Sequence, residues 1–220
     1  METSVIYLPD VADLTDAIEV DSSPGHNAVK GLAILLRHAG CQTDYTTIMG
    51  DIGQAFIFQG SEYDEHLTGG YADLGWWPWD RWHIGSRLHF LSWVTGGQLR
   101  HYEVDFSELS SHQEQAYAEL FQGTVCEELD AGRVCLAFWD FCHVVTGYDT
   151  NKPPLLGWDL THYTPQKKRM DHYPCAIITC SATSDPLNRN VVDRLALQHA
   201  VELGRGEIKA GAWVTGPLAW

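Results

Sequence analysis

The sequence predicts an α+β domain in which a helical first part is followed by a mostly antiparallel sheet. Two observations support this prediction. Early in the chain, apolar residues recur at the spacing of one helix face, at Ala28, Leu32, Leu35, Leu36 and Ala39. Later, short apolar runs alternate with connections rich in Asp, Asn, Lys and Pro, which is typical of strands. These runs cover residues 134–139, 142–148, 155–160 and 176–180.

The ends of the helices are marked by capping residues and glycines. Ser23 and Pro24 suit the start of the first helix, and Gly40 suits its end. A shorter helix is expected over 45–49, and a capping-box sequence at 111–114 begins another helix. Gly132 closes a further short helix. Two strands are expected around the glycines at 96 and 97, over 88–94 and 98–104.

The last helix is expected to begin with Asn190 as its cap. Its apolar stripe consists of Val192, Leu195, Ala196, His199 and Leu203. We find no internal repeat and no change of composition along the 220 residues. The sequence therefore predicts a single domain over 1–220, with a helical appendage over 188–220.

The net charge of the chain limits the partners that it can bind, and its cysteines and first twenty residues indicate its location. Asp and Glu number 29 against 14 Lys and Arg, which gives a formal net charge of −15. Such a surface repels phosphates, so we expect binding neither to nucleic acid nor to membranes. The first twenty residues have no basic start and no long apolar stretch, and the six cysteines form no Cys-x-x-Cys pair. We therefore expect reduced thiols and a cytoplasmic location.

A long stretch rich in tryptophan separates the helical part from the sheet. Residues 60–86 hold Trp76, Trp77, Trp79 and Trp82 and show no regular periodicity. Long loops of this kind are often lids or binding loops. Two interpretations stay open: the tryptophans cover the core from outside, or they line a substrate pocket.

The common nucleotide, zinc-protease and serine-hydrolase motifs are absent, so we expect neither a cofactor nor a metal. What remains is His143 in one predicted strand and Asp159 in the next. With a connection of about five residues, an antiparallel register places them side by side. A carboxylate there fixes the imidazole tautomer, as a catalytic base requires.

The chain also resembles a known family. A capped helix, a strand reading His-Val-Val-Thr-Gly-Tyr-Asp over 143–149 and a following strand with Asp159 resemble the papain-like cysteine-enzyme fold. The chain is more closely similar to the N-terminal domain of the butirosin-biosynthesis acyltransferase family. That similarity spans most of residues 22–160 and includes His26-Asn27, Gly40 and the Gly-rich segment 50–56. Further similar positions lie at 85–87 and 131–134.

The resemblance implies a papain-like domain, with its N-terminal helix packed on an antiparallel sheet, that moves acyl groups onto amines in specialised-metabolite biosynthesis. Relatives carry the nucleophilic Cys where this chain has Asn27. A carboxamide forms no thioester, and neither Cys41 nor Cys142 is placed to replace the missing thiol.

Three interpretations remain. In the first, His143 and Asp159 act as a base without a covalent intermediate, and Asn27 donates a hydrogen bond to an oxyanion at the helix N-terminus. In the second, the domain is a pseudoenzyme that binds a small molecule or a protein. In the third, Ser22 or Ser23 replaces the thiol.

The expected substrate is a small molecule that carries an amine, because the chain is acidic. Its expected binding residues are His26 and the four tryptophans. An acyl carrier protein and a second copy of the chain are the other partners that we consider. An acidic carrier would be repelled by the same acidic surface, so these two expectations conflict.

Overall fold

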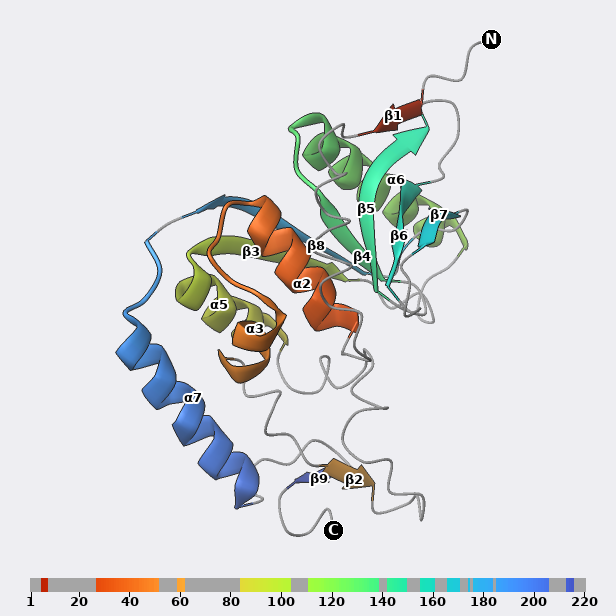
Figure 1. The fold of residues 1–220 in the computed structure, drawn as a ribbon. Helices are drawn as coiled ribbons and strands as arrows, with labels where there is room; N and C mark the ends of the chain where they lie inside the picture. Colours follow the sequence, from red (N-terminus) through yellow and green to blue (C-terminus); the bar gives the residue numbers. More distant parts are fainter. Residues whose placement is uncertain are drawn as a thin grey trace.

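The computed structural model describes residues 5–7, 27–51, 59–61, 84–103, 111–138, 142–149, 155–160, 166–170, 174, 176–183, 185–205 and 213–215. These ranges contain helices α2 (Asn27–His38), α3 (Tyr45–Asp51), α5 (Ile84–Thr95), α6 (Ser111–Asp130) and α7 (Arg189–Gly204). Together with the strands they form an α+β arrangement, as predicted (Figure 1).

Most strands belong to one antiparallel sheet. Its strands are β1 (Val5–Tyr7), β3 (Gly97–Glu103), β4 (Cys135–Phe138), β5 (Cys142–Asp149), β6 (Leu155–Asp159), β7 (Gln166–Met170) and β8 (Ala176–Thr183). The spatial order is β3-β8-β4-β5-β6-β7, and β1 pairs with the last residues of β5. A separate ribbon joins β2 (Gln59–Ser61) to β9 (Trp213–Thr215).

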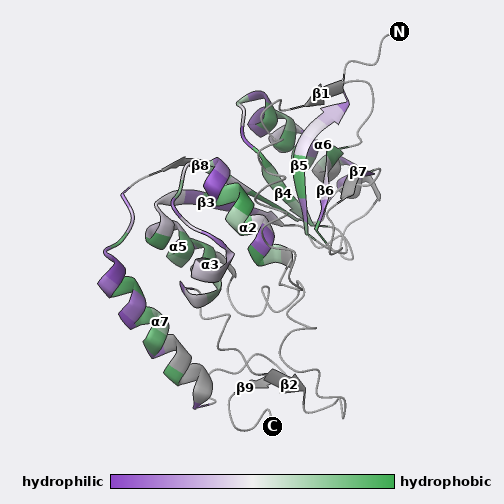
Figure 2. Ribbon diagram, viewed as in Figure 1, coloured by the Kyte–Doolittle hydropathy of each residue, from purple (hydrophilic) through white to green (hydrophobic). Residues whose placement is uncertain are grey.

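Helices cover both faces of the sheet. On one face, α2, α3 and α5 bury Val29, Leu32, Ile48 and Leu91 against strand residues that include Leu136 and Val144. On the other face, the inner side of α6 covers the alternate residues of the same strands. That second cluster consists of Phe121, Val125, Leu129, Cys135, Ala137, Val145, Leu155, Met170 and Ile177. In Figure 2 the hydrophobic colour covers parts of both α2 and β4, which contact each other.

The first predicted helix is confirmed as α2 from Asn27 onward, and its predicted start at Ser23 and Pro24 lies outside the described residues. Four of its stripe positions, Ala28, Leu32, Leu35 and Leu36, are buried. Gly40 has φ 90°, a left-handed conformation that glycine adopts without strain and that ends the helix. Gly132, with φ 76°, does the same after α6. Asp44 caps α3 by accepting a hydrogen bond from the Thr47 N–H at 2.7 Å.

Three sequence predictions are wrong. Residues 88–94 belong to helix α5, because Leu88, Leu91 and Val94 are buried at helical spacing. The region between 111 and 130 is one helix of 20 residues rather than two. The cap of α7 is Asn188, whose Oδ1 accepts a hydrogen bond from the Asn190 N–H at 2.9 Å.

The last predicted helix corresponds to α7, and only part of its predicted apolar stripe is buried. Val192 and Ala196 of the predicted stripe are buried, whereas Leu195 is exposed. Among the described elements, α7 packs mainly against α3, and the contact is small. Of the apolar end of the chain, Trp213–Thr215 forms β9, and the rest lies outside the described residues.

No helix among the described residues is long and apolar enough to span a membrane.

Candidate active site

The predicted pairing of His143 with Asp159 is confirmed by the strand register. β5 ends at Asp149 and β6 begins at Leu155, so the connection has the predicted length. In the antiparallel pair β5·β6, His143 lies opposite Asp159 and Val144 opposite Trp158. The shift in register near Val145 comes after this part of β5, so it leaves the pairing intact.

The two side chains form a buried pair. His143 Nε2 lies 3.7 Å from Asp159 Oδ2, and the residues are 6% and 4% exposed. At 3.7 Å the two atoms are beyond hydrogen-bond distance, so the contact is an ion pair when the imidazole is protonated. The fold therefore places an imidazole next to a carboxylate, both buried, at the end of two adjacent strands.

The pair lies on the face of the sheet that α6 covers. Residues directly opposite each other in an antiparallel pair share a face, and His143 lies opposite Ala137 of β4 as well as Asp159. Ala137 and Val145 belong to the cluster beneath α6. The neighbouring Cys142 and Val144 belong to the cluster on the other face, with α2.

Contacts of α2 confirm this division. A Cβ placed on Gly31 would lie 2.7 Å from Cys142 Sγ and 3.0 Å from Leu136 Cδ2, so α2 lies directly on this part of the sheet. Asn27 precedes Gly31 by about one turn, or roughly 6 Å along the axis. The first turn of α2 therefore lies near the start of β5, the end of the sheet that also holds His143 and Asp159.

Asn27 is the first residue of α2, but its side chain lies outside what the structure describes. Its convergence with His143 and Asp159 therefore stays a prediction. The packing adds a constraint, because the body of α2 and the imidazole are on opposite faces. A contact among all three would have to form around the end of the sheet.

The described cysteines are free and buried or half-buried, which agrees with the expectation of reduced thiols. Burial, together with the charge of Asp159, raises the pKa of Cys142. Burial also raises the pKa of Cys180 to about 12 and raises the pKa of Cys41 and Cys126. Such thiols are poor nucleophiles at neutral pH, so none of these four replaces the missing one.

Several predicted site residues lie outside the described part of the chain: His26 and the tryptophans at 76, 77, 79 and 82. Both interpretations of the tryptophan segment therefore stay open. Among the residues that are described, no group of three or more His, Cys, Asp or Glu side chains is placed to hold a metal ion.

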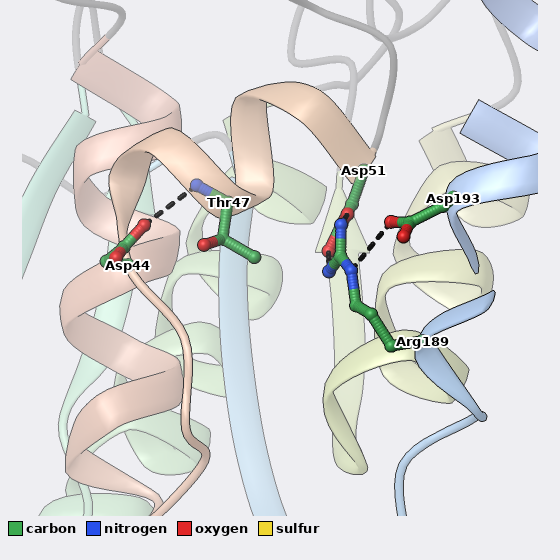
Figure 3. Close-up of polar contacts among 5 residues, drawn as sticks. All are labelled: Asp44, Thr47, Asp51, Arg189 and Asp193. Carbon is green, nitrogen blue, oxygen red and sulfur yellow. Dashed lines mark hydrogen bonds and ion pairs between the residues drawn. The ribbon is translucent and has the colours of Figure 1, made fainter. Parts of the chain in front are cut away.

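The structure also shows buried acidic residues that the sequence analysis did not single out. Asp51 of α3 accepts two hydrogen bonds from the Arg189 guanidinium, at 2.6 and 3.0 Å, and its side chain is 0% exposed (Figure 3). Asp149 of β5 lies 3.8 Å from Arg169. Both carboxylates have a cationic partner distant in sequence, so no local motif could have revealed them.

Comparisons with known proteins give no match: no protein-family model, no curated protein and no solved structure is similar to this chain at a significant level.

Proposed function

We propose that this domain carries out acyl-transfer or amide- and ester-type chemistry on a small molecule, without a covalent intermediate. One observation carries the proposal, namely the buried pair of His143 and Asp159 at the end of two adjacent strands. The resemblance to the butirosin-biosynthesis acyltransferase family suggests the reaction class and a role in specialised-metabolite biosynthesis. A papain-like fold is part of the same proposal, supported by α2 packing on an antiparallel sheet.

In the proposed reaction, the nitrogen of an amine acceptor attacks the carbonyl carbon of an acyl donor. His143 takes the proton that the amine loses and returns it to the leaving group as the carbonyl bond to that group breaks. Asp159 orients the imidazole and stabilises its protonated form. The N-terminus of α2, with Asn27, would stabilise the developing oxyanion through N–H donors and the helix dipole.

The test measures aminolysis and hydrolysis of an activated ester by the full chain, with a diamine as acceptor, across a range of pH. The wild-type rate should rise with pH as an imidazole loses its proton. His143→Gln should lower this rate by about 10²–10⁴-fold, the usual contribution of a general base. His89→Gln is the matched control, because His89 is an exposed histidine of α5, away from the pair. Equal rates for the two variants would refute base catalysis.

The burial of the pair favours a second candidate, a pseudoenzyme that binds a ligand. A His and an Asp that are both more than nine-tenths buried are also what a structural pair looks like. In that case His143→Gln lowers the free energy of unfolding, and the wild-type protein accelerates neither reaction over buffer. Measuring unfolding and turnover on the same variants separates the two candidates.

A thiol introduced at position 27 tests whether α2 and the pair share a site. A Cys in the first turn of α2, near an imidazolium, should have a lowered pKa. Asn27→Cys should therefore be alkylated at pH 7 much faster than any native cysteine, and adding His143→Ala should slow this labelling. If the introduced thiol is labelled equally fast with and without His143→Ala, Asn27 and the pair do not share a site. That result would not refute base catalysis by His143 and Asp159.

A further inference from the structure

Two of the buried cysteines, Cys41 and Cys180, lie far apart in the sequence but close together in the core. We propose that they form a reversible disulfide when hydrogen peroxide oxidises the protein, and that this bond locks the C-terminal end of α2 onto strand β8. The disulfide is a modification site of the fold and does not depend on the proposed catalytic function.

A glycine allows the two sulfurs to approach each other. Gly97 is the first residue of β3, and a Cβ placed on it would lie 3.1 Å from Cys41 Sγ and 3.1 Å from Cys180 Sγ. The two sulfurs therefore cannot be farther apart than twice that distance. An S–S bond is about 2 Å long, and rotation about a Cα–Cβ bond moves a sulfur by roughly 3 Å. Side-chain rotation is therefore the scale of movement that closing the bond requires.

Both cysteines lie on the face of the sheet that α2 covers. Cys41 and Cys180 belong to the same core cluster, whereas Cys135 belongs to the cluster beneath α6. The two thiols also influence each other. Burial is the main cause that raises the pKa of Cys180 to about 12, and the charge of a Cys41 thiolate adds to this rise. The packing and the electrostatics thus agree that the two sulfurs are neighbours.

The end of α2 fixes the backbone of Cys41. The Cys41 N–H donates a hydrogen bond to the Leu36 carbonyl and the Gly40 N–H donates one to the Arg37 carbonyl, both at 2.9 Å. With Gly40 in the left-handed conformation, this is a Schellman motif, in which the residue after the glycine commonly packs against the last turn of the helix. The motif therefore directs Cys41 into the core, toward Cys180.

Cys41 is the thiol that an oxidant reaches first. It is 6% exposed against 1% for Cys180, and its chain neighbours Gly40 and Gln42 are exposed. Burial raises the pKa of Cys41, and a side-chain hydrogen bond with Thr95 opposes this rise. Because the thiolate is the reactive form, the reaction is slow at neutral pH and needs sustained exposure to the oxidant.

The oxidation proceeds in two balanced steps. The Cys41 thiolate attacks one oxygen of hydrogen peroxide and the O–O bond breaks, which leaves a sulfenic acid, while the released hydroxide takes up the proton that the thiol lost. The Cys180 sulfur then attacks the Cys41 sulfur, the S–O bond breaks, and the Cys180 proton leaves with the hydroxide as water. The two thiols lose two electrons in total, and these reduce the peroxide to two waters.

The bond would stabilise the folded chain. It closes residues 41–180 into a covalent ring, and closing a long loop removes much of the conformational freedom of the unfolded chain. Oxidation should therefore raise the urea concentration at the midpoint of unfolding by about 1 M. A dithiol such as dithiothreitol should reverse this shift, because it reduces the disulfide.

The test exposes the full wild-type chain, freed of reductant, to hydrogen peroxide at mildly alkaline pH, where more thiolate is present. The remaining thiols are alkylated in denaturant, the chain is digested without reduction, and the peptides are mapped by mass spectrometry. A peptide pair joined through Cys41 and Cys180 should appear in a protein of monomer mass and should disappear after treatment with the dithiol.

Three variants identify the partners. Cys180→Ala should abolish the link and leave Cys41 as a sulfenic acid that a dimedone probe labels. Cys41→Ala should abolish both the link and the peroxide-dependent rise of the urea midpoint. Cys126→Ala is the matched control, because this half-buried cysteine belongs to α6, on the other face of the sheet, so the link should form as in wild type.

The peptide map is made on the wild-type protein, so a variant that fails to fold does not decide the result. The proposal is overturned if both cysteines are recovered as alkylated thiols at peroxide concentrations that oxidise the methionines of the chain. It is also overturned if either one is linked to a different cysteine, if the link joins two copies, or if the linked protein unfolds at the same urea concentration as the reduced one.

Discussion

Replacing Gly31 by Ala tests the contact between α2 and the sheet. The added Cβ would lie 2.7 Å from Cys142 Sγ and 3.0 Å from Leu136 Cδ2. Neither neighbour is the loose end of a flexible side chain, because Cys142 is 2% and Leu136 0% exposed. The variant must therefore displace α2 or a packed strand.

The magnitude follows from two opposing effects. Ala is favoured over Gly inside a helix by about 1 kcal/mol. Overpacking a core by one methyl group costs about 1–3 kcal/mol, and the two rigid neighbours place this position in the upper part of that range. We therefore expect Gly31→Ala to lower the free energy of unfolding by about 1–2 kcal/mol.

Urea unfolding followed by circular dichroism measures this loss, with Gly50→Ala of α3 as the matched control. Nothing lies within 4 Å of a Cβ at Gly50, so that variant should be as stable as wild type or more so. The substitution Cys142→Ala removes the sulfur that the new methyl group would meet. In that background, the loss in free energy of unfolding caused by Gly31→Ala should be about 1 kcal/mol smaller. If the two substitutions are simply additive, Cys142 does not face α2, and the assignment of His143 to the other face fails with it.

Two further predictions concern ion pairs and hydrogen bonds. Arg189→Ala leaves the buried carboxylate of Asp51 unpaired and should cost about 1–2 kcal/mol in urea unfolding, the half-exposed arginine giving less than a fully buried pair. Asp193→Ala removes only an exposed partner of the same arginine and should cost at most about 0.5 kcal/mol. The hydrogen bond to Asp130 raises the pKa of Tyr148 from 10.0 to about 12. Its contribution to stability is therefore complete below pH 10 and lost as the pH rises to about 12, so the stability difference from Tyr148→Phe should shrink over that window.

The pairing of His143 with Asp159 could be predicted because it depends on local quantities. Side chains alternate along a strand, and a short connection sets the register of two neighbouring strands. What the sequence could not supply is the face of the sheet on which the pair lies. That depends on which helix packs where, and the stripes of α2 and α6 fit either face equally well.

Other errors have the same kind of cause. Strand β7, at the edge of the sheet, has the sequence Gln-Lys-Lys-Arg-Met. The sequence analysis did not predict this strand, because its residues are polar. Charged residues are common on edge strands, because they hinder pairing with other chains. Leu195 fits the apolar stripe of α7 but is exposed, because burial depends on a neighbouring element and not on periodicity alone.

The order of strands in the sheet has a consequence for how the chain folds during synthesis. β4, β5, β6 and β7 are consecutive in both sequence and space, so this meander can assemble as soon as it leaves the ribosome. β3 is made earlier, and within the described part of the chain its one partner strand is β8, which is also the second neighbour of β4. The backbone N–H and C=O groups of β3 that pair with β8 therefore have no strand partner until β8 has been synthesised. During that interval the nascent chain exposes an unpaired strand, which makes it a candidate for chaperone binding until β8 inserts between β3 and β4.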